Sequence, residues 1–335
     1  MSDFEQRLIC LSECDGREDV IKQVLDSLPA KLYFKRKDFV QCRALLGLAD
    51  VLRYNSPRIH ELDVRLEPLG HHYSYAMTRL AHAVQQHSHV HTLRLRWSSD
   101  QLLSHFLAVA FGSNQSVSTL KIYDDSGLER DNITATVWSN FWAARRGMQH
   151  VDVFAFTKCR NAALVSSVIV NAPVNATELT LNECTLDMTA MQELSRKMED
   201  AASIRIINLQ AVRFRKPDFS HVARGIKHSR SLLTLRLNAS ALDAGSVTAL
   251  AEALKFNRSL VTLDLSSNAL DGDACKALGL ALALNKTIHE LVLFNCSFAD
   301  NGLDDLQRMK RENVVLVGVP PPRTGRHAGD DDHSA

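Results

Sequence analysis

Residues 259–268 read SLVTLDLSSN, and this stretch sets the frame of a pattern that returns every 28 residues. The preceding copy, residues 231–237, reads SLLTLRL, and the following copy, residues 287–293, reads TIHELVL. Each copy is a short predicted strand with apolar residues at relative positions 0, 3 and 5, where Leu260 occupies position 0. Self-similarity at a fixed period of this length is typical of solenoid proteins.

The same frame can be followed backward through most of the chain, with some repeats lengthened or shortened by a few residues. Further frames, given by their residues at positions 0, 3 and 5, are Ile59-Leu62-Val64, Val90-Leu93-Leu95, Val117-Leu120-Ile122, Met148-Val151-Val153, Ala176-Leu179-Leu181, Ile204-Ile207-Leu209 and a terminal Val314-Val317-Val319. The pattern therefore predicts a repeat array over residues 58–319, with about nine repeats.

The second half of each repeat has the pattern of a helix. Between two predicted strands, Leu242, Val247, Leu250 and Leu254 follow at spacings that place the last three on one helix face. Each repeat is therefore predicted to be a strand, a loop, a helix and a second loop. The strand and the helix each bury one face in a shared core, so the repeats must stack to fold.

Two further strings carry a resemblance to a known family. They are Asn257-Arg258-Ser259-Leu260 and Asn285-Lys286-Thr287-Ile288, which join each predicted helix to the next strand. With the long period and a true helix in each repeat, the chain resembles the ribonuclease-inhibitor-like class of leucine-rich repeat proteins. The resemblance implies an α/β fold, a right-handed horseshoe-shaped solenoid with a parallel concave sheet and convex helices.

The family also has a buried Asn after each strand, at the position of Asn268. In this chain the equivalent positions hold Cys184, Val212, Ser240 and Cys296. Ser and Cys side chains can donate a hydrogen bond in place of the Asn amide, whereas Val cannot. We therefore expect an incomplete hydrogen-bond ladder along the array.

The two ends of the chain depart from the repeat. Residues 1–57 contain amphipathic helical segments, and we expect them to form a helical N-terminal cap over the first repeat. Residues 320–335 are polar and rich in Gly and Pro, so a disordered tail is expected there.

Composition limits the class of protein. Lys and Arg total 39 against 38 Asp and Glu, so no basic excess points to nucleic acid. No apolar run is long enough to span a membrane. The first residues lack the pattern of a signal peptide, which predicts a cytoplasmic protein, with cytoskeletal or nuclear association as an alternative. Among the seven cysteines, Cys184, Cys275 and Cys296 fall at predicted core positions and are expected to be reduced thiols.

No catalytic motif is present, so the chain is predicted not to be an enzyme and to need no cofactor. The densest group of metal-ligand residue types is the run of His87, His89 and His91. It falls at a predicted helix-to-strand turn without an acidic or Cys partner at ligand spacing. We interpret it as a solvated turn rather than a metal site.

The concave strand faces carry the strongest candidate binding site. Because side chains alternate along a strand, positions 2, 4 and 6 of each frame should face outward. The predicted partner-binding residues, basic and aromatic, gather at these positions in the first four repeats: Arg65, Arg94, Arg96, Lys121, Tyr123, His150 and Phe154. Arg and aromatic side chains dominate binding energy at protein interfaces, so the patch predicts a protein partner of acidic character.

The function expected from these features is a non-enzymatic scaffold or regulator that binds a protein on its concave surface. The family resemblance adds a cytoskeletal or ciliary role as one subtype. The alternative is a GTPase-activating protein of the Ran-activator type. Those proteins have a long acidic segment after the array, whereas this chain offers Asp330, Asp331 and Asp332. The sequence leaves the identity of the partner and the oligomeric state open.

Overall fold

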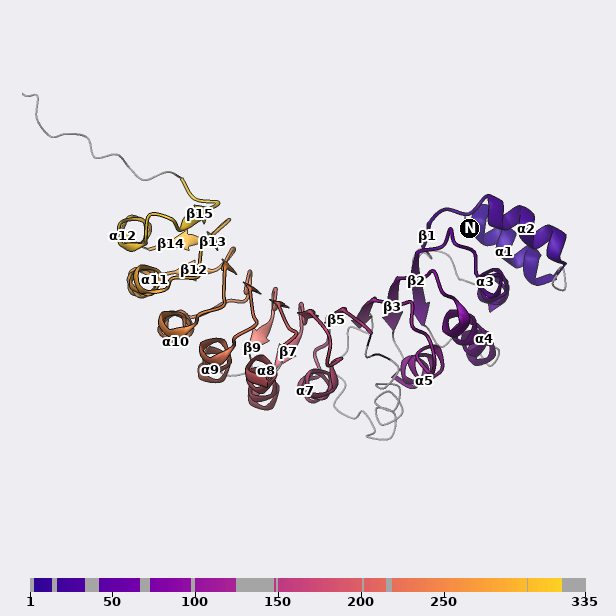
Figure 1. The fold of residues 1–335 in the computed structure, drawn as a ribbon, viewed down its shortest axis with the longest axis horizontal. Helices are drawn as coiled ribbons and strands as arrows, with labels where there is room; N and C mark the ends of the chain where they lie inside the picture. The colour runs from indigo at the N-terminus through magenta and orange to yellow at the C-terminus, as the bar shows by residue number, and fades with distance from the viewer. Residues whose placement is uncertain are drawn as a thin grey trace, which may run out of the picture.

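The computed structural model shows an arc of stacked repeats, with strands along its inner side and helices along its outer side (Figure 1). It describes residues 3–13, 17–33, 42–66, 73–97, 100–124, 148, 150–200, 202–214, 219–299 and 301–320. The predicted disordered tail, apart from its first residue, lies outside the described residues.

The inner wall of the arc is one sheet of eleven strands, and all neighbouring strands pair in parallel. In spatial order the strands are β1 (Lys31–Tyr33), β2 (Glu61–Leu66), β3 (Thr92–Trp97), β4 (Thr119–Asp124), β5 (Val153–Thr157), β6 (Glu178–Thr180), β8 (Ile206–Asn208), β10 (Thr234–Arg236), β11 (Thr262–Asp264), β13 (Glu290–Val292) and β15 (Val315–Val317). The parallel concave sheet predicted from the repeat is confirmed.

From β1 onward, helices alternate with the strands of the sheet and cover the outer side of the arc, while α1 and α2 lie at its N-terminal end (Figure 1). They are α1 (Asp3–Glu13), α2 (Glu18–Asp26), α3 (Cys42–Arg53), α4 (Tyr73–Gln86), α5 (Asp100–Ala110), α7 (Ala162–Asn171), α8 (Met188–Asp200), α9 (Ser220–His228), α10 (Ala244–Phe256), α11 (Gly272–Leu284) and α12 (Gly302–Met309). The predicted helix face is buried, since Val247, Leu250 and Leu254 have no exposed surface. Each repeat thus closes its core between one strand and one helix.

The sheet extends into the segment predicted to be a helical cap. Strand β1 pairs with β2, so that Leu32 lies beside Leu62, and both side chains are buried. Helix α1 packs on α3 so closely that a Cβ at Gly47 would lie 2.0 Å from the backbone oxygen of Leu8. The described residues of the N-terminal segment therefore form three helices and one strand that continues the sheet of the solenoid.

The predicted frame Met148-Val151-Val153 is wrong by three residues. In the structure Phe154 pairs with Leu120 and with Leu179, so Phe154 and not Val151 occupies position 3. Lys158 confirms this frame, because its φ of 65° matches the left-handed backbone of Glu183, four residues after Leu179. The cause is an uneven pair of repeats, the first longer and the second shorter than 28 residues, which the regular period concealed.

The terminal frame Val314-Val317-Val319 is also wrong, by one residue. Leu316 pairs with Leu291 and thus occupies position 3, whereas Val317 pairs with the outward-facing Val292. Four consecutive apolar residues, 314–317, fit either register, so hydrophobic alternation could not choose between them.

A ladder of side-chain hydrogen bonds links successive repeats just after their strands. Asn268 donates to the carbonyl of Leu237 at 3.0 Å. At equivalent positions, Ser240 Oγ donates to Leu209 at 2.8 Å and Cys184 Sγ to Phe156 at 3.3 Å. Cys296 Sγ likewise donates to the carbonyl of Leu265 at 3.3 Å. The predicted substitution of Asn by Ser and Cys is confirmed, and burial raises the pKa of the Cys184 thiol to about 12, which keeps it a donor.

A second ladder follows the helices, three residues before position 0 of each frame. Asn257 Oδ1 accepts the backbone N–H groups of Ser259 and Leu260, and its Nδ2 donates to the carbonyl of Ile226 at 2.7 Å. Asn285 and Asn114 make the same contacts in their own repeats. Asn257 and Asn285 have no exposed surface, so this Asn-x-Ser/Thr string serves the fold.

Candidate interaction surface on the concave face

Five of the seven predicted partner-binding residues lie together on β2, β3 and β4. Arg94 pairs with Lys121 on the next strand, and Arg96 lies between Arg65 and Tyr123. All five side chains are partly exposed on the concave face, between strand positions that are fully buried. We call this group, together with Glu61 and Asp63 of β2, the N-terminal concave patch.

Two carboxylates that the sequence analysis did not connect to the patch neutralise part of it. Arg94 forms an ion pair with Glu61, and Arg96 forms one with Asp63 at 3.2 Å. Both pairs are diagonal, from an outward residue of β2 to the residue two places further along β3. Four basic residues and two carboxylates leave the patch with a formal charge of +2. These ion pairs depend on how far side chains reach across neighbouring strands. The residue types at positions 2, 4 and 6 of the frames do not show that reach.

The Arg96 guanidinium is held on two sides. Its Nε and Nη2 donate to the two carboxylate oxygens of Asp63, at 3.2 and 3.4 Å. Its central carbon also lies 5.2 Å from the centre of the Tyr123 ring, within cation–π range. The Arg96 side chain is 41% exposed while that of Asp63 is 6% exposed. The fold thus presents an oriented cation, with an aromatic ring beside it, on top of a buried carboxylate.

The other two predicted residues do not belong to the patch. Phe154 is 1% exposed and packs in the core, because the corrected frame of β5 turns it inward. His150 precedes β5 and lies against Phe111, with ring centres 6.3 Å apart. Burial lowers the pKa of His150, which favours its neutral form. Val153, rather than His150, occupies the outward position 2 of this frame.

One member of the histidine run, His87, is buried and stabilises the turn that contains it. His87 is 2% exposed, and its Nδ1 accepts the backbone N–H groups of His89 and Val90 at 3.1 and 3.2 Å. His87 therefore takes the place that Asn114 holds in the next ladder position. Burial, followed by neighbouring histidines, lowers its pKa to about 4. The predicted solvated turn is wrong for His87, which is buried, whereas His89 is partly exposed and His91 is exposed.

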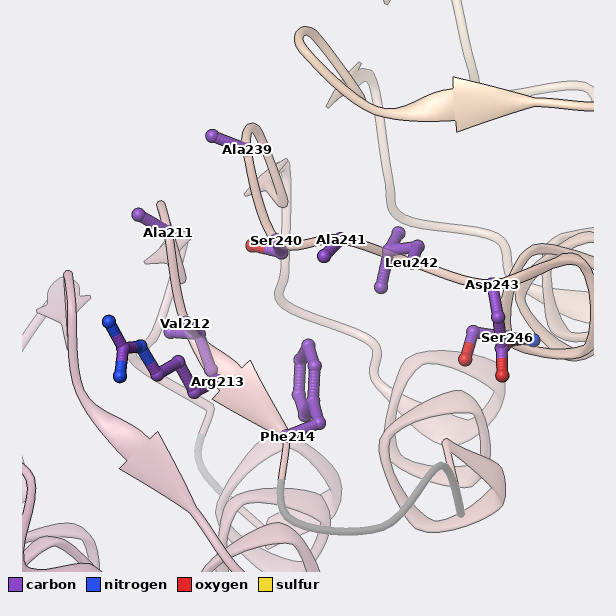
Figure 2. Close-up of a pocket in the computed structure, with 10 residues that line it drawn as sticks. All are labelled: Ala211, Val212, Arg213, Phe214, Ala239, Ser240, Ala241, Leu242, Asp243 and Ser246. Carbon is purple, nitrogen blue, oxygen red and sulfur yellow. Dashed lines mark hydrogen bonds between the residues drawn. The ribbon is translucent and has the colours of Figure 1, made fainter.

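A separate hollow opens where strands lead into helices on the other side of the repeat. Its cavity volume is about 520 Å³, and Figure 2 shows its lining between Phe214 and Leu242. Short strands pair on either side of it, β7 (Thr185–Leu186) with β9 (Arg213–Phe214) and β12 (Ala269–Leu270) with β14 (Ser297–Phe298). Ala241 occupies the position in its repeat that Arg213 of β9 and Ala269 of β12 occupy in the neighbouring repeats. Its φ of 47° is left-handed, so no short strand forms there and the hollow stays open.

The lining of this hollow offers little for chemistry. Asp243 accepts the backbone N–H of Ser246 at 2.7 Å as the N-cap of α10. Hydrogen bonds from the Ser246 side chain and then from its backbone N–H lower the pKa of Asp243 and occupy its carboxylate. Within the described ranges, no group of three or more His, Cys, Asp or Glu side chains could hold a metal ion. Among the residues that the structure describes, no helix is both long enough and apolar enough to cross a bilayer.

Comparison with solved structures shows the leucine-rich repeat fold. The leucine-rich repeat-containing protein LegL7 from Legionella pneumophila superposes with a TM-score of 0.51 at 15% identity, covering 88% of this chain and 96% of its own. An internalin (inlF) from Listeria monocytogenes covers 92% of this chain and 95% of its own at 12% identity, with a TM-score of 0.40. No protein-family model and no curated protein sequence matches the chain. The chain is thus a leucine-rich repeat protein by fold.

Proposed function

We propose that this protein is a non-enzymatic scaffold or regulator that binds a protein partner through the N-terminal concave patch. The observation that carries the proposal is the fixed Arg96 guanidinium between Asp63 and Tyr123. Arg and Tyr are enriched among residues that dominate binding energy, and a side chain already held in place loses little entropy on binding. The concave sheet of a solenoid is a surface commonly used for such contacts.

The patch favours a moderately acidic partner. The ammonium group of Lys121 and the partly exposed guanidinium of Arg96 both lie on the concave face. A partner carboxylate can pair with these groups, while Tyr123 provides apolar contact area. Because Glu61 and Asp63 lower the charge of the patch, we expect only moderate dependence of binding on salt. Cytoskeletal and ciliary proteins are the partners to test first, by analogy with the family resemblance.

The experiment is capture of partners from a lysate by the intact chain and by charge variants. Changing Arg94 and Arg96 to Glu would crowd new carboxylates against Glu61 and Asp63, so Gln is the better replacement. The variant Arg94→Gln/Arg96→Gln removes both charges and keeps a shorter polar side chain at each position. We expect it to unfold at a lower temperature than wild type, because Glu61 and Asp63 are nearly buried and lose their Arg partners. At a temperature where circular dichroism shows both proteins folded, its recovery of the main partners should fall about tenfold or more.

Two single variants give a matched comparison. Lys121 and Arg236 both occupy position 4 of their strands on the same sheet face, several repeats apart. Lys121→Gln should weaken partner recovery, whereas Arg236→Gln should leave it unchanged. The opposite result would move the contact surface to the C-terminal repeats and refute the proposal. Adding GTP-loaded Ran-type GTPases tests the alternative function, and we expect no acceleration of hydrolysis.

A further inference from the structure

A second surface lies at one edge of the arc, on three consecutive turns that join a helix to the next strand. These turns are residues 227–233, 255–261 and 283–289, after α9, α10 and α11, which follow one another along the arc (Figure 1). We call them the basic rim. They are 28 residues apart and lead into strands paired in register, so equivalent side chains form columns across the repeats.

The rim is strongly basic for its size. The three turns contain no Asp or Glu. Their five Lys and Arg residues are Lys227, Arg230, Lys255, Arg258 and Lys286. Lys255 forms an ion pair with Glu252 of α10, so the positive charge of the rim depends mainly on the other four. Basic residues at helix C-termini interact favourably with the helix dipole. Arg258 also caps α10, because it donates to the carbonyls of Lys255 and Asn257 at 2.9 Å. That effect explains a preference for positive charge, but not the apolar side chains beside it.

Large apolar side chains stand exposed in the same columns. Phe256 and Leu284 are equivalent residues at the ends of α10 and α11, and they are 56% and 60% exposed. Leu233 and Val261, equivalent residues just before β10 and β11, are 42% and 37% exposed. Their neighbours in the same turns, including Leu232 and Leu260, are buried and suffice for the core. Exposed apolar groups clustered among charges mark an interaction surface.

The basic and apolar groups are interleaved. The Nζ atom of Lys227 lies 4.6 Å from the centre of the Phe256 ring. A cation from one repeat therefore contacts an aromatic ring from the next repeat. Successive turns of a solenoid stand side by side and give an even edge. The described cavity lies elsewhere, among the loops that lead from strand to helix. Such an edge suits a broad, flat, negatively charged surface better than it suits a helix that must settle into a groove.

We propose that the basic rim docks the protein on an anionic lipid membrane. Lys and Arg side chains are attracted to acidic headgroups, while Phe256 and Leu284 enter the boundary between headgroups and acyl chains. Single-stranded RNA is the competing anionic surface, but three of the four exposed apolar residues of the rim are aliphatic, and Phe256 alone offers a ring on which a base can stack. This membrane contact uses a different face from the N-terminal concave patch, so both can be occupied together.

The test is sedimentation of the intact protein with lipid vesicles. Wild type should bind vesicles of phosphatidylcholine with phosphatidylserine, should not bind pure phosphatidylcholine, and should be released by high salt. The variant Arg230→Glu/Arg258→Glu/Lys286→Glu should bind the anionic vesicles about tenfold or more weakly. Phe256→Ser/Leu284→Ser should also weaken binding, with less effect on its salt dependence.

A matched charge-reversal control lies on the other edge of the arc. Lys158, Arg160 and Arg213 are exposed near the strand-to-helix loops. Changing these three to Glu alters the net charge equally and should leave vesicle binding unchanged. Equal loss in the rim variant and in this control would overturn the proposal, because it would show an effect of net charge alone. Absence of wild-type binding to anionic vesicles, or binding to poly(U) RNA in its place, would also overturn it.

Discussion

Arg96 of β3 and Asp63 of β2 form a two-pronged pair across adjacent parallel strands, at 3.2 and 3.4 Å. The carboxylate is nearly buried in the concave face and the guanidinium stands above it. Glu61 and Arg94 repeat the relationship two residues earlier. The concave patch is therefore an organised set of charges and not a group of independently solvated side chains.

The variant Asp63→Asn separates the effect of organisation from the effect of charge. It makes the patch more positive but weakens the two hydrogen bonds that orient Arg96. If orientation governs recognition, partner affinity falls in Asp63→Asn despite the added positive charge. If net charge governs it, affinity rises. We expect the fall, with a loss of folding stability of about 1 kcal/mol, measured by urea unfolding.

The corrected frame of β5 predicts opposite results for two neighbouring residues. Phe154 fills the core at position 3, whereas Val153 is only partly buried at position 2. Phe154→Ala should lower the free energy of unfolding by about 3–5 kcal/mol, since it opens a cavity. Val153→Ala should cost less than about 1 kcal/mol. Chemical denaturation of both variants checks this, and a larger loss for Val153→Ala would restore the regular 28-residue frame.

Acid should weaken the N-terminal repeats through His87. Its pKa is about 4 in the folded protein against 6.5 for an ordinary histidine, so the folded state binds the proton less readily. The stability that neutral His87 contributes is complete above about pH 6.5 and is lost as the pH falls toward 4. This loss should amount to about 2 kcal/mol near pH 4.5.

His87→Asn is the control for this effect. An Asn side chain can accept the same two backbone N–H groups, as Asn114 does one repeat further on, and it does not titrate. The variant should equal wild type at pH 7 and exceed it at pH 4.5 in urea unfolding. Identical pH dependence of the two proteins would show that His87 is not the acid-sensitive group.

Most of the fold could be predicted from the repeat alone. Strand register was clear wherever apolar and polar residues alternate, as at Leu263 and Leu265 around Asp264. It failed near β5, where two repeats of uneven length move position 3 from Val151 to Phe154. It failed again at residues 314–317, where consecutive apolar residues fit two alignments. Strand β1 was missed because a single short strand among helices carries no periodic signal of its own.

The candidate site was predicted less completely. The columns placed Arg65, Arg94, Arg96, Lys121 and Tyr123 together, because strand alternation and repeat spacing determine those positions. They could not show which carboxylate reaches which guanidinium. The burial of His87 could have been predicted, because His87 stands three residues before position 0 of its frame. Asn114 holds the same position one repeat later. The signal is visible only when His is counted as a hydrogen-bond acceptor equivalent to Asn.

Site-specific photo-crosslinking tests the central claim most directly. A benzophenone amino acid would replace Tyr123 in one variant and Asn238 in another. Both residues occupy position 6 on the concave face, in different parts of the arc. Binding at the N-terminal concave patch predicts a crosslinked partner from the Tyr123 position and little or none from Asn238. A partner captured from Asn238 but not from Tyr123 would contradict the account.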